Sequence, residues 1–293
     1  FCTTIFNNWI ICTRKFLSTS SREVNSMSTT LVWRFEIPVM PSLFEIDSDL
    51  TYEVVDKIAD GRMGAVFRAY QMGSEGFAKE VAIKVLHERF AMQRQFIENF
   101  IGEGKLVADL IHPQIVQIYN FGDEGKSLYR RMGAQSNIKL QGDQRAYYMV
   151  MEFISGGDFF THIHSAPKTG FTTNRIKQHL AEIVLAVHHL HRNYIIYRDL
   201  KPENILLDGA GHAKLVDFGL SYRGKAGKPL RTTSFCGTEK YMAPEQLLNR
   251  PYESSVDWWS LGLLVAEMTS GGKHPFRGKT RLETCRNVVQ RSP

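Results

Sequence analysis

The chain has 293 residues, of which 43% are hydrophobic and 23% charged, a balance that excludes a largely disordered or collagen-like chain. No run of about 18 apolar residues occurs, so we expect no membrane-spanning helix. The formal net charge of +6 favours scattered surface lysines over a nucleic-acid-binding patch. The four cysteines lie far apart, which predicts neither a zinc site nor a disulfide framework and suits a reducing compartment such as the cytoplasm.

The first 49 residues differ in composition from the rest. Residues 1–26 begin with Phe1 and combine serines and threonines with three basic residues and one acidic residue. This composition resembles a mitochondrial transit peptide, in which case the protein would be mitochondrial. Sequence translated upstream of a start at Met27 would look the same, and we favour it. We therefore expect residues 1–49 to form an N-terminal extension that is disordered or is upstream or transit sequence.

The remaining chain is rich in predicted strands first and in predicted helices second. Residues 51–71 alternate apolar and polar positions on either side of a glycine turn, which predicts a β-hairpin. Residues 94–109 have apolar spacing of three to four and predict a helix, weakened by Gly102 and Gly104. The other expected strands are 80–86, 115–121 and 147–153, and the other expected helices are 175–192 and 258–270.

A polar, glycine-containing stretch at 123–145 separates two strands that a tight turn could join. A loop of that length is usually functional or disordered. We favour a flexible insertion over a regulatory docking element, and a retained intron would have the same appearance.

Two further features have ordinary structural explanations when taken singly. The turn from Ala59 to Val66 contains Gly61 and Gly64, and glycine lets backbone N–H groups approach a phosphate closely. Hairpin turns are rich in glycine, however. Lys84 ends the apolar run Val81 to Lys84, where a solvated edge charge is the common interpretation.

The stretch from Tyr197 to Asn204 reverses these interpretations. It reads YRDLKPEN and is followed by DFG at 217–219 and APE at 243–245. Phosphoryl transfer needs cations on the phosphates, oxygen ligands for Mg²⁺ and a carboxylate near the attacking hydroxyl. The chain contains all three kinds of group in these motifs.

In this order, the glycine turn, VAIK, RDLKPEN, DFG and APE resemble the eukaryotic-type protein kinases over about residues 50–285. The resemblance implies an α+β, bilobal kinase fold with a β-rich N-lobe at 50–153, including the insertion, and an α-helical C-lobe at 154–293. It also implies ATP and Mg²⁺ as cofactors.

The family's catalytic roles can be placed on matching positions. By resemblance, Asp199 is the base that receives the substrate's hydroxyl proton, and Lys201 neutralises the transferred phosphate. Asn204 and Asp217 hold Mg²⁺, and Lys84 binds the α- and β-phosphates.

The nucleotide-binding residues follow in the same way. Glu103 is the expected helix partner of the VAIK lysine, with Glu98 as the alternative, and Glu152 to Ile154 form the adenine hinge. The implied ATP-binding positions, besides Lys84, are Ile58, Ala59, Gly61, Gly64, Val66, Ala82, Met151, Glu152, Ile154 and Asp158.

The subgroup that the chain resembles is the AGC kinases. Tyr197 in place of histidine, the segment 232–245 and the run 256–262 are typical of them. By that resemblance Ser234 is the phosphosite of an upstream activating kinase, and Arg198 pairs with the phosphate. Thr238 lies beside the catalytic base and favours Ser/Thr over Tyr substrates.

Three acidic residues fall where such kinases read arginines that precede the target, namely Asp158, Glu203 and Glu267. Ordinary surface carboxylates are the alternative interpretation. We therefore predict a Ser/Thr kinase for basic-directed protein substrates, with no nucleic-acid partner. A non-catalytic kinase-like module and a small-molecule phosphotransferase are the competing functions.

The sequence departs from the family in two places. Ala59 replaces the first glycine of the turn, and we expect its methyl group to weaken nucleotide affinity. The chain also ends before the last C-lobe helices, and the arginine that pairs with the APE glutamate, here Glu245, is missing. An unpaired buried charge costs about 3–5 kcal/mol, so we expect a C-terminally truncated, marginally stable fold.

Overall fold

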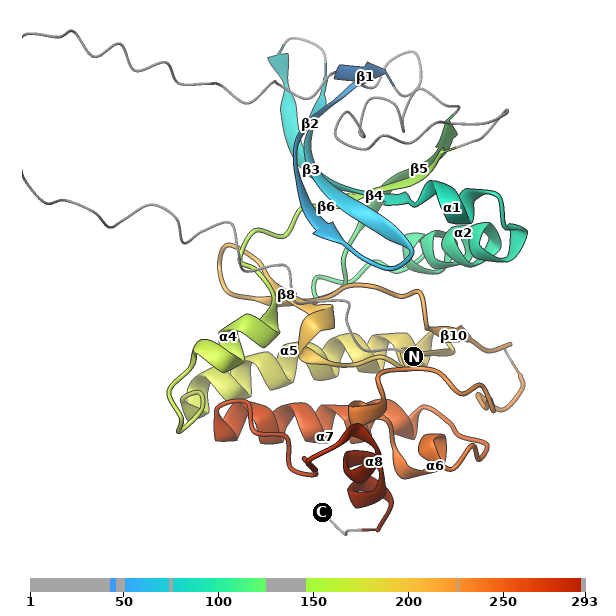
Figure 1. Ribbon diagram of the computed structural model, residues 1–293. Helices are drawn as coiled ribbons and strands as arrows, with labels where there is room; N and C mark the ends of the chain where they lie inside the picture. Colours follow the sequence, from blue (N-terminus) through green and yellow to red (C-terminus); the bar gives the residue numbers. More distant parts are fainter. Residues whose placement is uncertain (1–42, 46–50, 74–75, 125–145, 226, 291–293) are drawn as a thin grey trace, which may run out of the picture. The chain divides into compact units, whose positions relative to one another are not determined.

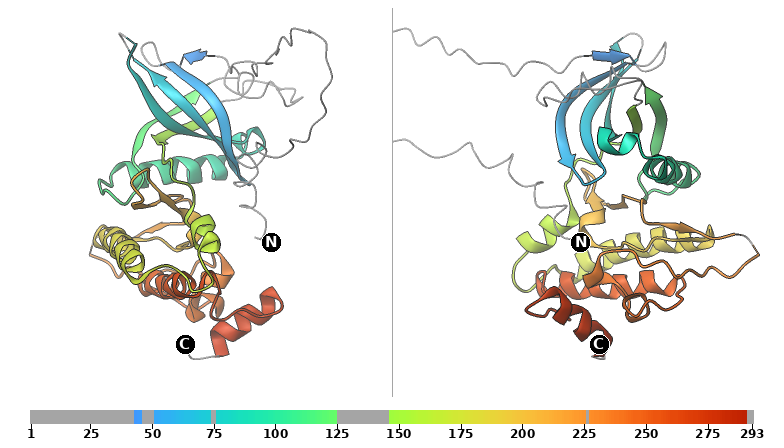
Figure 2. Two further views of the ribbon diagram at one scale, coloured as in Figure 1. Left: turned by 90° about the vertical axis from the view of Figure 1, so that its left-hand side faces the viewer. Right: turned by 45° about the vertical axis from the view of Figure 1, so that its right-hand side comes forward.

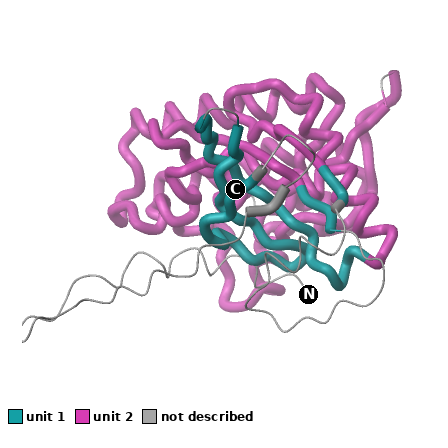
Figure 3. The backbone as a smooth tube through the Cα atoms, turned by 90° about the horizontal axis from the view of Figure 1, so that it is seen from above, with its two compact units in different colours: residues 1–91, 122–148 teal, residues 92–121, 149–293 magenta. Residues whose placement is uncertain are grey.

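The computed structural model describes residues 43–45, 51–73, 76–124, 146–225 and 227–290. The chain forms two compact units, shown in different colours in Figure 3. The first comprises residues 1–91 and 122–148, and the second comprises residues 92–121 and 149–293. The predicted N-terminal extension lies outside the described residues except for 43–45, and the predicted insertion lies outside them except for 123 and 124.

The strands β1 to β6 form one six-stranded sheet (Figure 1), of which β1 to β4 belong wholly to the first unit. The strand order is β1-β2-β3-β4-β6-β5, and the short helix α1 (Glu88–Ala91) follows β4. The strands are β1 (Leu43–Glu45), β2 (Thr51–Asp60), β3 (Gly64–Met72), β4 (Ala78–Leu86), β5 (Ile118–Glu124) and β6 (Ala146–Glu152).

The predicted hairpin at 51–71 is confirmed as β2 and β3, which pair antiparallel with a register shift on each side of Lys57. β3 then pairs antiparallel with β4 from Gly64 opposite Leu86 to Met72 opposite Ala78. The β-branched and aliphatic residues of β4 fill the interior of the unit, because Val81 and Ile83 are fully buried.

Helix α2 (Arg94–Ala108) confirms the helix predicted at 94–109. The helix belongs to the second unit, and its Leu106 and Val107 join the large core of that unit. The two glycines differ in their surroundings. A Cβ at Gly104 would lie 3.1 Å from Met149 Cε, whereas a Cβ at Gly102 would meet nothing within 4 Å.

The second unit is mainly helical, and its helices α5 and α7 run side by side (Figure 2). They begin two and three residues before the predicted helices at 175–192 and 258–270 and end where those were predicted to end. The helices are α4 (Phe159–Ser165), α5 (Thr173–Arg192), α6 (Pro244–Leu247), α7 (Ser255–Ser270) and α8 (Arg281–Gln290). Short strands and single turns join them: β7 (Ile195–Ile196), η2 (Pro202–Asn204), β8 (Ile205–Leu207), β9 (Ala213–Leu215), β10 (Tyr222–Arg223) and η3 (Glu239–Tyr241).

The core of the second unit fixes the loops that carry the predicted catalytic residues. Helix α5 buries Ile183, Ala186, Val187 and Leu190, which recur at helical spacing. Tyr197, Leu200, Ile205, Leu215 and Phe218 belong to the same cluster of buried residues. The loop at 197–204 and the loop at 217–219 are therefore each anchored by buried side chains that alternate with the predicted functional residues.

The architecture confirms the predicted α+β class, with a sheet in one unit and helices in the other. In the part of the chain that the structure describes, no helix has the length and apolar character needed to cross a membrane.

Candidate active site

The loop that follows β7 is held by a buried carboxylate on α7. Asp257 accepts hydrogen bonds from the backbone N–H of Tyr197 at 2.9 Å and of Arg198 at 2.8 Å. Its Oδ2 atom also lies 2.7 Å from His191 Nε2. Arg198 has a φ of +68°, a left-handed conformation that is unusual for a residue with a side chain. Asp257 therefore stabilises a strained backbone directly before Asp199.

Tyr197 reinforces this loop from the core. Its hydroxyl donates to the backbone carbonyl of Val216, which precedes the DFG motif. Burial, together with the nearby charges of Asp217 and Asp199, raises the pKa of the Tyr197 phenol well above its usual value. The neutral phenol therefore links the loop at 197–204 to the loop that carries the DFG motif.

Asp199 is the centre of a compact polar cluster. Its Oδ1 atom accepts from the backbone N–H and the hydroxyl of Thr238, at 2.9 and 2.8 Å. Its Oδ2 atom accepts from Lys201 Nζ at 2.7 Å and from Asn204 Nδ2 at 2.9 Å. Lys201 Nζ also donates to the Thr238 hydroxyl at 2.8 Å. The structure therefore brings together four of the residues that the sequence singled out.

Asn204 leaves one oxygen available in this cluster. The residue is fully buried, and its Oδ1 atom has no hydrogen-bond partner in the part of the chain that the structure describes. Buried polar atoms nearly always have a partner, so an unpaired amide oxygen needs an explanation. An amide oxygen is a ligand that hard divalent cations accept, which fits a metal held at this position.

Asp217 and Glu103 both lie close to Gly219 in the second unit. A Cβ at Gly219 would lie 3.4 Å from Asp217 Oδ1 and 3.4 Å from Glu103 Oε2. Asp217 has a φ of +61°, so its backbone is also held in the left-handed region. Among the described residues no three His, Cys, Asp or Glu side chains are gathered around one point. One or two carboxylates combined with substrate phosphates are the usual protein site for Mg²⁺.

The glycine turn of the first unit is closed by backbone hydrogen bonds and by the side chains of His87 and Arg89. Gly61 N–H donates to Gly64 O at 2.9 Å, and His87 N–H donates to Met63 O at 2.8 Å. His87 Nε2 lies 2.9 Å from Gly61 O, and Arg89 donates to the carbonyl of Arg62 at 2.9 Å. The roles of His87 and Arg89 were not predicted from the sequence, because they lie more than 20 residues from the turn.

Ala59 lies within β2 and is paired with Val66 on β3, which in turn is paired with Lys84 on β4. The methyl group therefore lies within the strand, directly after the second register shift, and does not stand at the tip of the turn. Of the other predicted nucleotide-binding residues in this unit, Ala82 is buried, whereas Ile58 is partly exposed.

Gly64 has no room for a side chain. A Cβ there would lie 2.3 Å from the backbone oxygen of Val85, so one of the two strands must shift. We expect Gly64→Ala to lower the free energy of unfolding by about 1–3 kcal/mol, the usual cost of overpacking. Urea unfolding measures this. Gly102→Ala, in open space on α2, is the control and should not destabilise the protein; equal stability of both variants would contradict the prediction.

The predicted hinge residues lie in the second unit. Glu152 donates its N–H to Gln117 O at 2.9 Å, and its Oε1 atom lies 2.8 Å from Lys214 Nζ. Ile154 is buried, whereas Met151 is partly exposed. Both carboxylate oxygens of Asp158 accept from Thr161, at 2.7 Å each, and so cap the start of α4.

Ser234 and Arg198 are linked through a residue that the sequence analysis missed. The Tyr252 hydroxyl donates to Ser234 O at 2.7 Å and lies 3.4 Å from Arg198 Nη1. Ser234 itself is exposed, with Thr232 as its neighbour. No local signal marks Tyr252, because its partners lie 18 and 54 residues away.

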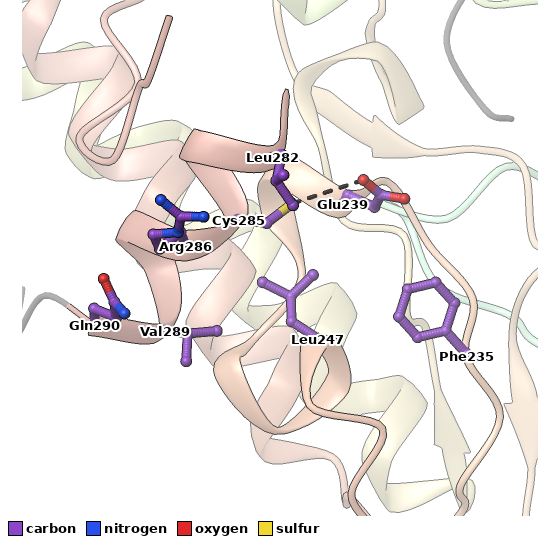
Figure 4. Close-up of a pocket in the computed structure, with 8 residues that line it drawn as sticks. All are labelled: Phe235, Glu239, Leu247, Leu282, Cys285, Arg286, Val289 and Gln290. Carbon is purple, nitrogen blue, oxygen red and sulfur yellow. Dashed lines mark hydrogen bonds between the residues drawn. The ribbon is translucent and has the colours of Figure 1, made fainter. Parts of the chain in front are cut away.

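A pocket of about 330 Å³ lies beside α8 and contains none of the predicted site residues (Figure 4). Glu239 lines it and is paired with Arg281, while Cys285 Sγ lies 3.7 Å from Glu239 Oε2. Its lining residues are Phe235, Glu239, Leu247, Leu282, Cys285, Arg286, Val289 and Gln290.

Comparison with known proteins places this cluster in a family context. The family model described as "Protein kinase domain" matches residues 52–292. Ribosomal protein S6 kinase alpha-6 of Danio rerio is 38% identical over 240 residues, which cover 82% of this chain and 29% of that protein. Ribosomal protein S6 kinase alpha-2 of Homo sapiens is 38% identical over 248 residues, 84% of this chain and 30% of that protein. This chain thus spans about 30% of the length of these relatives.

Proposed function

The chain belongs to the protein kinase domain family, and we propose that it is an ATP-dependent serine/threonine kinase of the AGC type. In this proposal it transfers the γ-phosphate of ATP to Ser or Thr hydroxyls of protein substrates that carry basic residues. The cluster in which Asp199 contacts Lys201, Asn204 and Thr238 is the observation that carries the proposal.

The residues of this cluster suit distinct parts of the reaction. When bound, Mg²⁺-ATP supplies the phosphoryl group and the positive charge of the metal. Asp199 would accept the proton that the substrate hydroxyl loses as its oxygen bonds to the γ-phosphorus, while the bond from that phosphorus to the β-phosphate oxygen breaks and ADP leaves. Lys201, whose ammonium lies 2.7 Å from Asp199, places positive charge where negative charge develops.

Other residues, in each of the two units, would hold the metal and the nucleotide. Asn204, through its unpaired Oδ1, and Asp217 would hold Mg²⁺. Lys84 would bind the α- and β-phosphates, beside the glycine turn of the same unit. The Thr238 hydroxyl, 2.8 Å from Asp199, would favour aliphatic hydroxyl substrates over the longer tyrosine.

Regulation through Ser234 is a further part of the proposal. The serine is exposed, and Arg198 reaches the same Tyr252 hydroxyl that binds the Ser234 backbone. A phosphate added by an upstream kinase would bring about −1.5 to −2 charges towards this arginine. A cytoplasmic location stays a prediction from the cysteine pattern.

Metal dependence tests the proposal without a known substrate. We expect ATP with Mg²⁺ to raise the melting temperature by several degrees at saturation, because ligand at about 100 times its Kd adds about 2.7 kcal/mol. ATP with EDTA should have a much smaller effect, since phosphate repulsion at Asp217 is then uncompensated. Differential scanning fluorimetry measures both. A cooperative melt that Mg²⁺-ATP does not move would contradict nucleotide binding.

A further inference from the structure

Two carboxylates and one ammonium group meet close to the candidate active site. Glu203 lies in η2, directly before Asn204, and Glu267 lies in α7. Lys240 lies in η3, and its Nζ atom is 3.7 Å from Glu203 Oε1. All three residues belong to the second unit.

The ammonium group of Lys240 pairs with only part of this acidic site. A separation of 3.7 Å is an ion pair that is too long for a hydrogen bond. Glu203 Oε2 is buried and has no hydrogen-bond partner among the residues that the structure describes. The Glu203 side chain is 16% exposed, so an incoming group can reach the site.

Glu267 forms the buried side of the same site. It accepts a hydrogen bond from the Tyr241 hydroxyl at 2.8 Å and is only 2% exposed. Burial raises the pKa of its carboxyl to about 7, with the charge of Glu203 acting in the same direction and that of Lys240 in the opposite one. The Tyr241 hydroxyl thus fixes the Glu267 carboxyl at the buried side of the site.

Lys240 rests on aromatic rings from which it can move away. Its Nζ atom lies 4.6 Å from the Tyr241 ring centroid and 5.9 Å from that of Phe160 on α4. Cation–π contacts of an exposed ammonium are weak. The side chain is 38% exposed, while the backbone carbonyl is fixed by His274 Nε2 at 2.8 Å. The ammonium can leave the site without movement of the backbone.

We propose that Lys240 determines substrate specificity, because its ammonium occupies the acidic site of Glu203 and Glu267 and a basic substrate side chain must displace it. The inference rests on the proposed kinase function. An arginine side chain would succeed, since its planar guanidinium can donate to both oxygens of Glu203, including the one that Lys240 leaves unpaired. A substrate lysine would gain little by replacing one ammonium with another. The protein therefore prefers arginine to other substrate side chains at this site. This preference is smaller than the one that the two carboxylates would give without Lys240.

The test is Lys240→Met, which removes the charge and keeps the apolar stem on the two rings. The substrates are serine peptides that each carry one arginine, lysine or glutamine. This residue is placed in turn at each position near the target serine. At one position, we expect kcat/KM for arginine relative to glutamine to rise about tenfold in the variant, mainly through KM, as expected for loss of one competing ion pair. In the variant, kcat/KM for lysine relative to glutamine should also rise at the same position. Lys168→Met, an exposed lysine elsewhere in the unit, should leave both ratios unchanged.

Fluorescence anisotropy of the labelled peptides separates this inference from the proposed function, because binding needs no phosphoryl transfer. Tighter binding of the arginine peptide by Lys240→Met supports the role of Lys240 even if neither protein transfers phosphate. Unchanged ratios in both assays, in an enzyme that does transfer phosphate, would overturn the role of Lys240 and leave the kinase proposal intact. Glu203→Gln in the Lys240→Met background should abolish the gain. Lys240→Ala replaces the first variant if that protein fails to fold.

Discussion

Replacing Asp199 with asparagine is expected to lower kcat by about 10²- to 10⁴-fold, the range that a lost general base accounts for. An amide of the same size cannot accept the hydroxyl proton. It also presents an N–H₂ group where Asp199 now accepts from Lys201, Asn204 and Thr238. The rise in melting temperature with Mg²⁺-ATP should persist, because Asp199 would contact the substrate hydroxyl and not the nucleotide. Steady-state peptide phosphorylation measures the loss.

The matched control is Asp109→Asn, which makes the same change on an exposed carboxylate in the same unit. Asp109 is 64% exposed and pairs with Arg223 at 3.0 Å, an interaction expected to contribute little to stability. Its kcat should equal that of the unmodified protein. Turnover of Asp199→Asn within tenfold of the unmodified protein would show that another group removes the proton.

The second large effect is expected at Asp257, which is almost fully buried. Asp257→Asn is expected to lower the free energy of unfolding by about 3 kcal/mol. The carboxylate accepts from Tyr197 N–H, Arg198 N–H and His191, and an asparagine would turn an N–H₂ group towards one of these donors. The left-handed backbone at Arg198 then loses its support, so kcat should fall as well.

Urea unfolding and peptide phosphorylation are both needed for this variant. Asp109→Asn again serves as the control, because surface substitutions usually change stability by no more than about 0.5 kcal/mol. A variant of Asp257 with stability within that range and normal turnover would mean that the loop before Asp199 holds its shape without the carboxylate.

Much of the candidate site could be predicted because its residues are close in sequence. Asp199, Lys201 and Asn204 lie within six positions, so any compact turn brings them together. The hairpin around Gly61 and Gly64 was equally local, since alternation and turn residues fix its register. For these elements, local pattern and tertiary structure agree.

The parts that escaped prediction depend on contacts between distant segments. Asp257 reaches the Tyr197 backbone across 60 residues, and its own surroundings on α7 carry no sign of that role. The contact of Tyr252 with Ser234 is of the same kind. The burial of Glu267 and the position of Lys240 beside Glu203 arise from the packing of α7 and η3. Such pairings follow from how helices pack, which the pattern of a single chain does not determine.

The most direct test of the central claim is γ-phosphate transfer from Mg²⁺-ATP to an arginine-containing serine peptide, followed by mass spectrometry, with Asp199→Asn purified alongside. We expect the peptide to gain one phosphate on serine with the unmodified protein, and we expect Asp199→Asn and EDTA each to prevent this. A folded protein that binds Mg²⁺-ATP but transfers no phosphate, even after phosphorylation of Ser234, would contradict the account and indicate a nucleotide-binding module without catalysis.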